Sequence, residues 1–207
     1  MSFELITNPL IEAQIAIFLD KKSNISECEQ SLGLASLMMA IEFGHYLDFG
    51  FQEIETITSK EKFPTLIGKI TLMPILRSGL SMISGFKKVF PFASVSHVIL
   101  SRDSLENIIV SKLYYSEQML KNKLILMDPI IGTGLSINIV VDYLLSKGIS
   151  PDRINIASLM ATPQGIEKIT NHCDKIKLFI CYFAKCLENM ANTFPRQGNA
   201  GPRIFGL

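Results

Sequence analysis

The sequence predicts an α/β fold in which a mostly parallel central sheet is flanked by helices. Short apolar runs bounded by turn residues recur along the chain, as expected of strands buried on both faces. Stretches with helical apolar spacing separate these runs, and this alternation favours a parallel sheet with helices on both faces. The 207 residues are 48% hydrophobic, which is ample for a full core. We expect a single domain over residues 1–207, with an N-terminal helical and edge-strand part (1–60), a core sheet (65–185) and a C-terminal tail (186–207).

The N-terminal part is expected to be mainly helical. Asn8-Pro9 has the pattern of an N-cap followed by proline at the first helical position, and it predicts a helix that ends near Asp20. The run Ser26-Glu27-Cys28-Glu29 matches a capping box and predicts the start of a long, mostly buried helix. Phe49–Thr58 alternates loosely, as edge strands do, and Ser59–Pro64 is interpreted as a polar turn.

An arginine follows the first strand of the expected core sheet. Gly68–Pro74 is predicted as this strand, and it runs into Ile75-Leu76-Arg77-Ser78-Gly79 before a helix from Leu80 to Val89. An arginine just past a strand end, beside a small flexible pair, is a candidate anion site. From this stretch alone, an ordinary surface arginine is the commoner interpretation.

The next strand is expected to lead into a flap. Val95–Leu100 is predicted as the strand, and Ser101-Arg102-Asp103 closes it. The following segment, Ser104–Tyr115, alternates polar and apolar residues without a clear helical or strand period. A mobile flap fits this pattern, because loops at strand ends often carry function.

The central strand is the run Leu124-Ile125-Leu126-Met127, which ends at Asp128. The loop Gly132-Thr133-Gly134-Leu135-Ser136 then leads into a helix that ends at Lys147-Gly148. Ligands bind at the carboxyl ends of strands in open α/β sheets, and the N–H groups of a helix N-terminus suit a phosphate. For the loop alone, a plain strand–turn–helix connection is an equally good interpretation. Asp128 would repel a phosphate, so we expect it to face ribose hydroxyls or a metal.

The last third of the chain repeats the alternation of strands and helices. Ile154–Met160 and Leu178–Phe183 are predicted as strands, and Thr162-Pro163 as the cap of the helix between them. The tail Pro195–Leu207 is rich in glycine, for which a frayed terminus is the usual interpretation. The apolar pair Ile204-Phe205 speaks against it.

Composition and motifs argue against several classes of protein. A net charge of +1 predicts no nucleic-acid partner, and no apolar run reaches membrane-spanning length. Neither a Gly-Lys-Ser/Thr phosphate loop nor a Gly-x-Gly-x-x-Gly dinucleotide motif occurs. No signal peptide is visible, which predicts a cytoplasmic protein with reduced, buried thiols. The cysteines lack paired metal-ligand spacing, so we expect no metal site made by protein ligands; they are Cys28, Cys173, Cys181 and Cys186.

Three segments together carry the most specific signal, namely Met73-Pro74-Ile75-Leu76-Arg77-Ser78-Gly79-Leu80, Asp128–Ser136 and Gly198–Gly206. In this order and spacing they resemble the uracil phosphoribosyltransferase family, whose fold is that of the type I phosphoribosyltransferases. Asn8-Pro9-Leu10 and Ala161-Thr162-Pro163-Gln164-Gly165-Ile166 also look like that family, so the likeness covers nearly the whole chain. The resemblance implies transfer of a phosphoribosyl group from 5-phosphoribosyl 1-pyrophosphate to uracil, giving UMP and pyrophosphate in pyrimidine salvage. It also implies Mg²⁺ held through the pyrophosphate of the donor, and a homodimer.

The resemblance assigns roles to individual residues. Asp128 matches the acid that engages the ribose hydroxyls, and Arg77 matches the arginine that binds pyrophosphate; these two form the implied catalytic pair. Arg102 matches the arginine at the base of the mobile flap. The implied donor-binding set is Arg77, Arg102, Asp128, Pro129, Ile130, Ile131, Gly132, Thr133, Gly134, Leu135, Ser136 and Asn199. The implied uracil-binding set is Thr193, Gly198, Asn199 and Ala200, in a C-terminal hood that closes over the base and reads its edge through main-chain groups.

The implied roles suit the chemistry. Breaking the bond at the anomeric carbon builds positive charge on the sugar and negative charge on the departing pyrophosphate. Arginines and Mg²⁺ stabilise that negative charge, and a closed flap excludes water. The protein needs no strong nucleophile, and none of its histidines, serines or cysteines stands in a recognisable nucleophile setting.

The sequence departs from the family pattern at a few positions. Leu135 stands where the phosphate loop usually has a second glycine, and would crowd the backbone there. Asn199 and Pro202 replace two acids of the tail, Asn192-Thr193 replaces a tyrosine and an aliphatic residue, and the flap lacks the tyrosine ahead of Lys112-Leu113. Three functions therefore stay open: an active uracil enzyme, transfer to another base, and a relative that binds a nucleotide or phosphoribosyl ligand and regulates or scaffolds without turnover.

Overall fold

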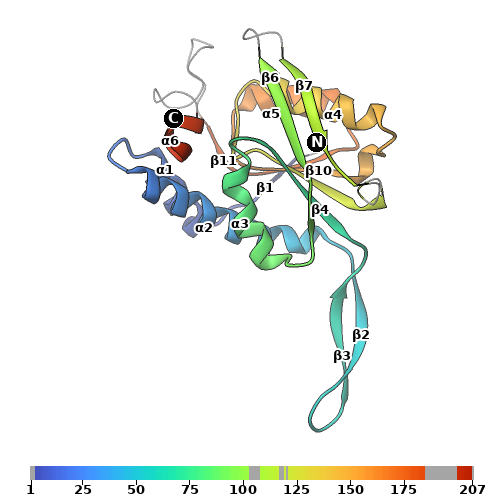
Figure 1. Cartoon of the computed structure of the whole chain (residues 1–207). Helices are drawn as coiled ribbons and strands as arrows, with labels where there is room; N and C mark the ends of the chain where they lie inside the picture. The colour runs from blue at the N-terminus through green and yellow to red at the C-terminus, as the bar shows by residue number, and fades with distance from the viewer. Residues whose placement is uncertain (1–2, 103–107, 117–118, 120, 185–199, 207) are drawn as a thin grey trace.

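The structure is a computed structural model that describes residues 3–102, 108–116, 119, 121–184 and 200–206. Its central sheet has the strand order β1-β11-β10-β8-β4-β6-β7 (Figure 1). These strands are β1 (Phe3–Leu5), β4 (Ile70–Leu76), β6 (His97–Arg102), β7 (Ile108–Tyr114), β8 (Lys123–Met127), β10 (Ile154–Ala161) and β11 (Lys177–Phe183). Two short strands, β5 (Ser94–Val95) and β9 (Ile130–Ile131), pair with β4 and β10. All these pairs are parallel except β6 with β7, which confirms the predicted sheet.

Helices cover both faces of the sheet, as the sequence predicts (Figure 1). One core joins the sheet to α1 (Pro9–Leu19), α2 (Ile25–Phe43) and α3 (Leu80–Val89), and a second joins it to α4 (Leu135–Ser146) and α5 (Pro163–His172). Along β8 the side chains alternate between the two cores, with Ile125 and Met127 in the first and Leu124 and Leu126 in the second. All four are fully buried, which explains why this strand is apolar throughout.

The start of α1 confirms the predicted cap, whereas α2 begins at a different signal. The Asn8 side chain accepts a hydrogen bond from the Leu10 N–H, and Pro9 is the first helical residue. The capping box of α2 is formed by Asn24 and Glu27, not by Ser26 and Glu29. Asn24 Oδ1 accepts from the Glu27 N–H at 3.0 Å, and Glu27 Oε2 accepts from the Asn24 N–H at 2.8 Å. Asparagine is as good an N-cap as serine, and the cap lies at Asn24, ahead of the predicted Ser26.

A two-stranded antiparallel hairpin projects from the body of the molecule (Figure 1). Its strands are β2 (Phe49–Glu55) and β3 (Lys60–Leu66), so the prediction of a polar turn over Ser59–Pro64 was wrong. The turn lies at residues 56–59, where the Thr56 hydroxyl donates to the Ser59 carbonyl at 2.7 Å. Because both faces of this hairpin are largely exposed, its strands carry polar residues that resemble a loop in sequence.

Part of the segment expected to be an irregular flap is a strand. β7 pairs antiparallel with β6, with a register shift between Ile99 and Leu100. The shift explains why Ser104–Tyr115 shows no clear strand period, since a bulge moves side chains to the opposite face. Residues 103–107 lie outside the described part of the chain.

The end of the chain forms α6 (Ala200–Phe205), a short helix that packs against α2. Ile204 is 2% exposed and belongs to the core under α1–α3, which rules out a frayed terminus for this stretch. Two short 3₁₀ turns, Gly44–Tyr46 and Pro151–Arg153, complete the elements of the described chain. None of its helices combines the length and apolar character that a membrane span requires.

Candidate active site

Three of the predicted site residues follow or end neighbouring strands at the carboxyl edge of the sheet. The neighbouring strands β8, β4 and β6 end beside Asp128, Arg77 and Arg102, respectively. Pro74 on β4 lies opposite Met127 on β8, so the two strands end side by side. Segments that lie 50 residues apart in the chain are thereby brought to one place, which is where ligands bind in sheets of this kind.

Asp128 is fixed by hydrogen bonds from its main chain and its side chain. Its N–H donates to the Ala157 carbonyl on β10 at 3.2 Å. Its Oδ1 accepts a hydrogen bond of 2.9 Å from the hydroxyl of Ser78. Sequence reasoning treated Ser78 as one of a small flexible pair and missed it as the partner of Asp128. The available signal was a hydroxyl residue at the end of a strand that pairs with the central one.

The loop between β4 and α3 is held close to the end of β8. The Gly79 N–H donates to the Ile75 carbonyl at 2.9 Å, and the Leu80 N–H donates to the Arg77 carbonyl at 3.1 Å. A methyl group on Gly79 would overlap the Met127 carbonyl oxygen, so only glycine allows this approach. The Leu76–Arg77 peptide bond is cis, and the Arg77 side chain is exposed at the edge of the sheet. The loop therefore presents a cation from an ordered main chain.

The loop from Gly132 to Ser136 ends in a glycine cap at the start of α4. Gly134 has φ +74°, in the left-handed region, and is the N-cap residue. Because glycine has no side chain, it makes no cap hydrogen bond to the first turn; Thr133 Oγ1 accepts from the Leu135 N–H at 3.4 Å. The positive end of α4 and its main-chain N–H groups are suited to a phosphate.

The residues at the start of α5 hold this loop by hydrogen bonds. The Thr162 hydroxyl donates to the Gly132 carbonyl at 2.6 Å and accepts from the Gly165 N–H at 3.0 Å. The Thr162 N–H donates to the Ile131 carbonyl at 3.0 Å. A methyl group on Gly165 would overlap the Gly132 carbonyl oxygen. The sequence predicted Thr162 as a helix cap, which the structure confirms, and the structure adds its contact with the predicted phosphate loop.

The structure describes some of the remaining predicted residues and leaves others out. Ile130 and Ile131 form β9, which pairs with β10. The Ile131 side chain is 2% exposed and lies in the core, so Ile131 anchors the start of the loop and does not offer its side chain to a ligand. Leu135 is half-buried at the first position of α4. Ala200 is the first residue of α6. Outside the described part of the structure lie Thr193, Gly198, Asn199 and the side chain of Arg102.

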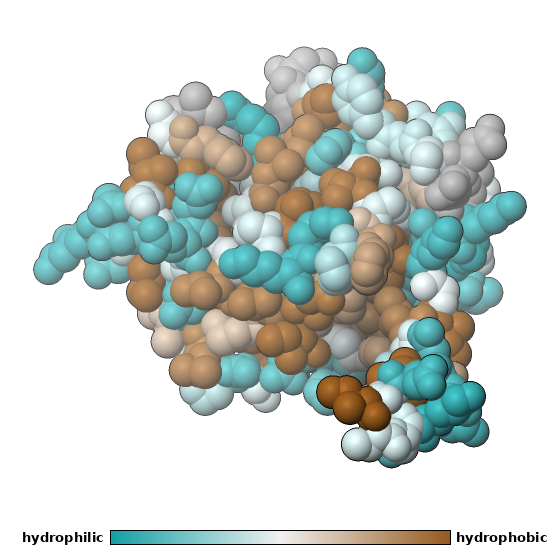
Figure 2. All heavy atoms as spheres, turned by 60° about the horizontal axis from the view of Figure 1, so that its bottom comes forward, coloured by the Kyte–Doolittle hydropathy of each residue, from teal (hydrophilic) through white to brown (hydrophobic). Residues whose placement is uncertain are grey.

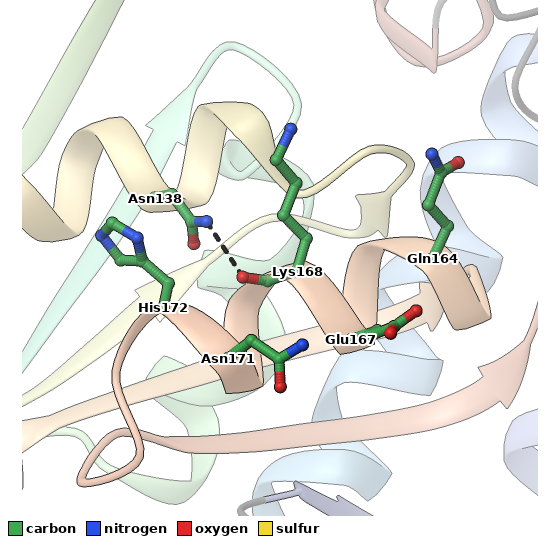
Figure 3. A pocket seen from close by; sticks show the side chains of 6 residues that line it. All are labelled: Asn138, Gln164, Glu167, Lys168, Asn171 and His172. Atoms are coloured by element: carbon green, nitrogen blue, oxygen red, sulfur yellow. Dashed lines mark hydrogen bonds between the residues drawn. The ribbon is translucent and has the colours of Figure 1, made fainter.

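A polar pocket of about 400 Å³ lies between α4 and α5 and contains none of the predicted site residues (Figure 3). Asn138 Nδ2 donates to the Lys168 carbonyl across it at 3.2 Å, and His172 Nε2 lies 2.6 Å from Asp142 Oδ1. These contacts join α5 to α4 beyond the loop at Gly132–Ser136. The pocket is lined by Asn138, Gln164, Glu167, Lys168, Asn171 and His172.

Cysteines and metal ligands do not gather in the described residues. Cys28, Cys173 and Cys181 are free thiols, and burial raises the pKa of Cys181 to about 12, so this thiol stays protonated at neutral pH. No three His, Cys, Asp or Glu side chains within the described ranges are grouped to hold a metal ion.

The strand order and the two loops at the carboxyl edge define the type I phosphoribosyltransferase fold. The structure of the AQ2163 protein from Aquifex aeolicus superposes with a TM-score of 0.89, at 20% identity over 99% of this chain and 98% of that one. The adenine phosphoribosyl transferase of Trypanosoma brucei superposes with a TM-score of 0.55, at 8% identity over 88% and 84% of the two chains.

Sequence comparison narrows the class to one family. The family model for uracil phosphoribosyltransferase matches residues 5–207. The uracil phosphoribosyltransferase of Wolinella succinogenes is 30% identical over 97% of both chains. That of Clostridioides difficile is also 30% identical, over 100% of this chain and 99% of its own. The chain belongs to the uracil phosphoribosyltransferase family.

Proposed function

We propose that this protein transfers the phosphoribosyl group of 5-phosphoribosyl 1-pyrophosphate to uracil, giving UMP and pyrophosphate. The observation that carries this proposal is the meeting of an acid, an arginine and a glycine-capped helix start at one edge of the sheet. Full-length similarity to relatives that bear the name of this activity supports it.

Each part of the donor has a matching part of the site. The 5-phosphate accepts hydrogen bonds from the loop at Gly132–Ser136, where the N-terminus of α4 supplies N–H groups and positive potential. Asp128 accepts hydrogen bonds from the ribose hydroxyls. An ionised carboxylate is a strong acceptor, whereas a phosphate site consists of donors. Arg77, exposed beside it, binds the pyrophosphate. The resemblance to the family assigns Arg102, the last residue of β6, to the same group.

We propose that Mg²⁺ enters this site bound to the pyrophosphate of the donor. Mg²⁺ prefers oxygen ligands, keeps several waters and binds through one or two carboxylates together with substrate phosphates. The pyrophosphate of the donor supplies such oxygens, and Asp128 stays with the ribose hydroxyls. When bound, the ion neutralises the charge that develops on the leaving pyrophosphate. The chain's own residues hold the ribose and the two phosphate ends in line, and Arg77 stabilises the same charge.

The base is proposed to lie under the C-terminal tail. Thr193, Gly198, Asn199 and Ala200 form the proposed hood, and main-chain groups read the edge of uracil. Support comes from α6, which follows directly: Ile204 is buried, and Arg203 Nη2 donates to the Asp20 carbonyl at 2.8 Å. α6 is thereby held against α1 and α2, and we propose that residues 1–207 act as one domain.

We also propose a homodimer in the cytoplasm. Contiguous apolar surface often marks a protein interface, and Figure 2 shows apolar side chains gathered on the face at the bottom of Figure 1. Exposed apolar residues lie on α1, α2 and the β2–β3 hairpin: Leu10, Ile17, Leu34, Ile41, Phe51, Ile57 and Phe63. Free thiols at Cys28, Cys173 and Cys181 suit a reducing compartment. Sedimentation velocity on the wild type and on the double variant Phe51→Ser, Ile57→Ser tests the dimer. We expect a dimeric wild type and a monomeric variant. The same oligomeric state in both proteins would count against an interface on the hairpin.

One assay tests the proposed activity. The protein is incubated with labelled 5-phosphoribosyl 1-pyrophosphate and Mg²⁺, and uracil, cytosine, hypoxanthine and adenine are offered separately. We expect labelled UMP with uracil and no other nucleotide. A nucleotide of another base would keep the transfer and correct the acceptor. Binding of the donor without any product would favour a relative that regulates or scaffolds.

A further inference from the structure

The hydroxyl of Ser78 links the two loops that are proposed to bind opposite ends of the donor's ribose. Its Oγ donates to Asp128 Oδ1 at 2.9 Å, within the normal range for O–H···O hydrogen bonds. Both side chains are half-buried. Ser78 is the residue after Arg77, so the hydrogen bond joins the proposed pyrophosphate loop to the proposed ribose acid.

We propose that Ser78 is a positioning residue, which orients the Asp128 carboxylate for the ribose hydroxyls and couples that acid to the pyrophosphate loop. This inference rests on the proposed function, since it assigns Ser78 a role in binding the donor. Neither a ribose contact nor a proton transfer is assigned to Ser78 itself.

The main chain around Ser78 is held on two sides, which fixes where its short side chain can reach. The Ser78 carbonyl accepts from the Ser81 N–H at 3.1 Å and from the Ser81 hydroxyl at 2.8 Å. On the other side, Gly79 lies too close to the Met127 carbonyl to admit a methyl group. A serine Oγ is one bond from Cβ, so this main chain limits the donor atom to the three staggered χ1 positions.

The same hydrogen bond has a consequence for how the donor binds. Because the Ser78 main chain is already held, the hydrogen bond orients the Asp128 carboxylate before the donor arrives. A group that is ordered beforehand loses less entropy when it binds its ligand. Loss of the Ser78 hydroxyl should therefore weaken binding of the whole donor and leave the affinity for pyrophosphate alone unchanged.

The test compares Ser78→Ala with Ser81→Ala as a matched control. Both remove one hydroxyl from the same turn, but the Ser81 hydroxyl donates to the Ser78 carbonyl and not to Asp128. Calorimetry measures the affinity for 5-phosphoribosyl 1-pyrophosphate and for pyrophosphate alone, both with Mg²⁺. We expect Ser78→Ala to weaken donor binding roughly tenfold, the loss typical of one hydrogen bond to a charged group. Its affinity for pyrophosphate alone should match that of Ser81→Ala.

A double-mutant cycle separates positioning from a general loss of structure. In an Asp128→Ala background the Ser78 hydroxyl has no carboxylate to orient, so Ser78→Ala should change donor affinity less than twofold. The pair Ser78→Thr and Ser78→Val keeps similar volume and differs in the hydroxyl; the threonine variant should bind the donor more tightly. This pair replaces the alanine variant if the latter fails to fold.

Three outcomes would overturn the proposal. Equal donor affinity in Ser78→Ala and Ser81→Ala would remove the positioning role while leaving the proposed function intact. The same tenfold loss in the Asp128→Ala background would show that Ser78 acts without Asp128. A wild-type protein that binds no 5-phosphoribosyl 1-pyrophosphate would overturn the proposed function and the positioning role together.

Discussion

The Thr162 hydroxyl donates a hydrogen bond to the Gly132 carbonyl, with 2.6 Å between the two oxygens. Through this contact the residue before α5 holds the first residue of the proposed phosphate loop, 30 positions away in the chain. Thr162 is fully buried, so no water can take the place of the partner of its hydroxyl. The loop is therefore ordered by the protein before a phosphate arrives, which reduces the cost of binding.

Thr162→Val should weaken donor binding and lower stability. The substitution keeps the shape of the side chain and leaves the Gly132 carbonyl and the Gly165 N–H without their partner, at a cost of about 1–3 kcal/mol. Calorimetric titration with 5-phosphoribosyl 1-pyrophosphate and a thermal melt measure the two effects. Thr162→Ser retains the hydroxyl and is the control; equal affinities for the donor in both variants would mean that the contact does not shape the loop.

Gly165→Ala should damage the site although it adds only one methyl group. The added methyl group overlaps the Gly132 carbonyl oxygen, so α5 or the phosphate loop must move. We expect a loss of about 1–3 kcal/mol in stability, as for overpacking, together with weaker donor binding. Gly33→Ala is the matched control, because this glycine also lies in a helix and its methyl group would be 3.4 Å from Ser84 Oγ of α3, an ordinary contact. If Gly165→Ala melts and binds like the control, the close approach of α5 is not needed.

Leu135→Gly should bring no gain in donor binding, although the family usually has glycine there. The left-handed residue of the loop is Gly134, at φ +74°, and Leu135 is already the first residue of α4. Leu135 is half-buried, so its removal costs contact area, and glycine in a helix costs about 0.5–1 kcal/mol more. Thermal melts and donor titrations of Leu135→Gly and Leu135→Ala measure this. Tighter binding by the glycine variant would show that leucine does crowd the phosphate.

Much of this site follows from local sequence, and the rest depends on which strands are neighbours. Asp128 could be placed at a strand end because β8 is apolar on both faces and the turn residues after it are unmistakable. The contacts of Ser78 with Asp128 and of Thr162 with Gly132 require the order β10-β8-β4, which chain order does not reveal. The strands β3 and β7 escaped prediction for another reason. They gain main-chain hydrogen bonds in hairpins without burying one regular face, so their side chains carry little periodic signal.

Arg203→Ala should impair the use of uracil more than the binding of the donor. The Arg203 guanidinium donates to the Asp20 carbonyl at 2.8 Å and lies 5.4 Å from the centre of the Phe18 ring, so it holds α6 on α1. Its loss should loosen the tail that is proposed to cover the base. Steady-state kinetics should show a KM for uracil raised about tenfold, with the KM for the donor changed less than threefold, for an interaction of about 1–2 kcal/mol. Arg203→Lys should recover part of the effect. Equal changes in the KM for uracil and the KM for the donor would contradict the proposal that the tail covers the base.

The central claim is that the carboxyl edge of the sheet binds the donor with Asp128 at its ribose. The most direct measurement compares Asp128→Asn with the wild type in two quantities, kcat/KM for 5-phosphoribosyl 1-pyrophosphate in UMP formation and the thermal midpoint. Loss of charge at one hydrogen-bonded carboxylate should lower kcat/KM by a factor of roughly 10–100, about 1.5–3 kcal/mol, since the interaction belongs to the bound donor. The thermal midpoint should stay within a few degrees, because Asp128 lies at a strand end and Ser78 can still donate to the amide oxygen. A large fall in the midpoint with unchanged activity per folded molecule would make Asp128 a structural residue and contradict the account.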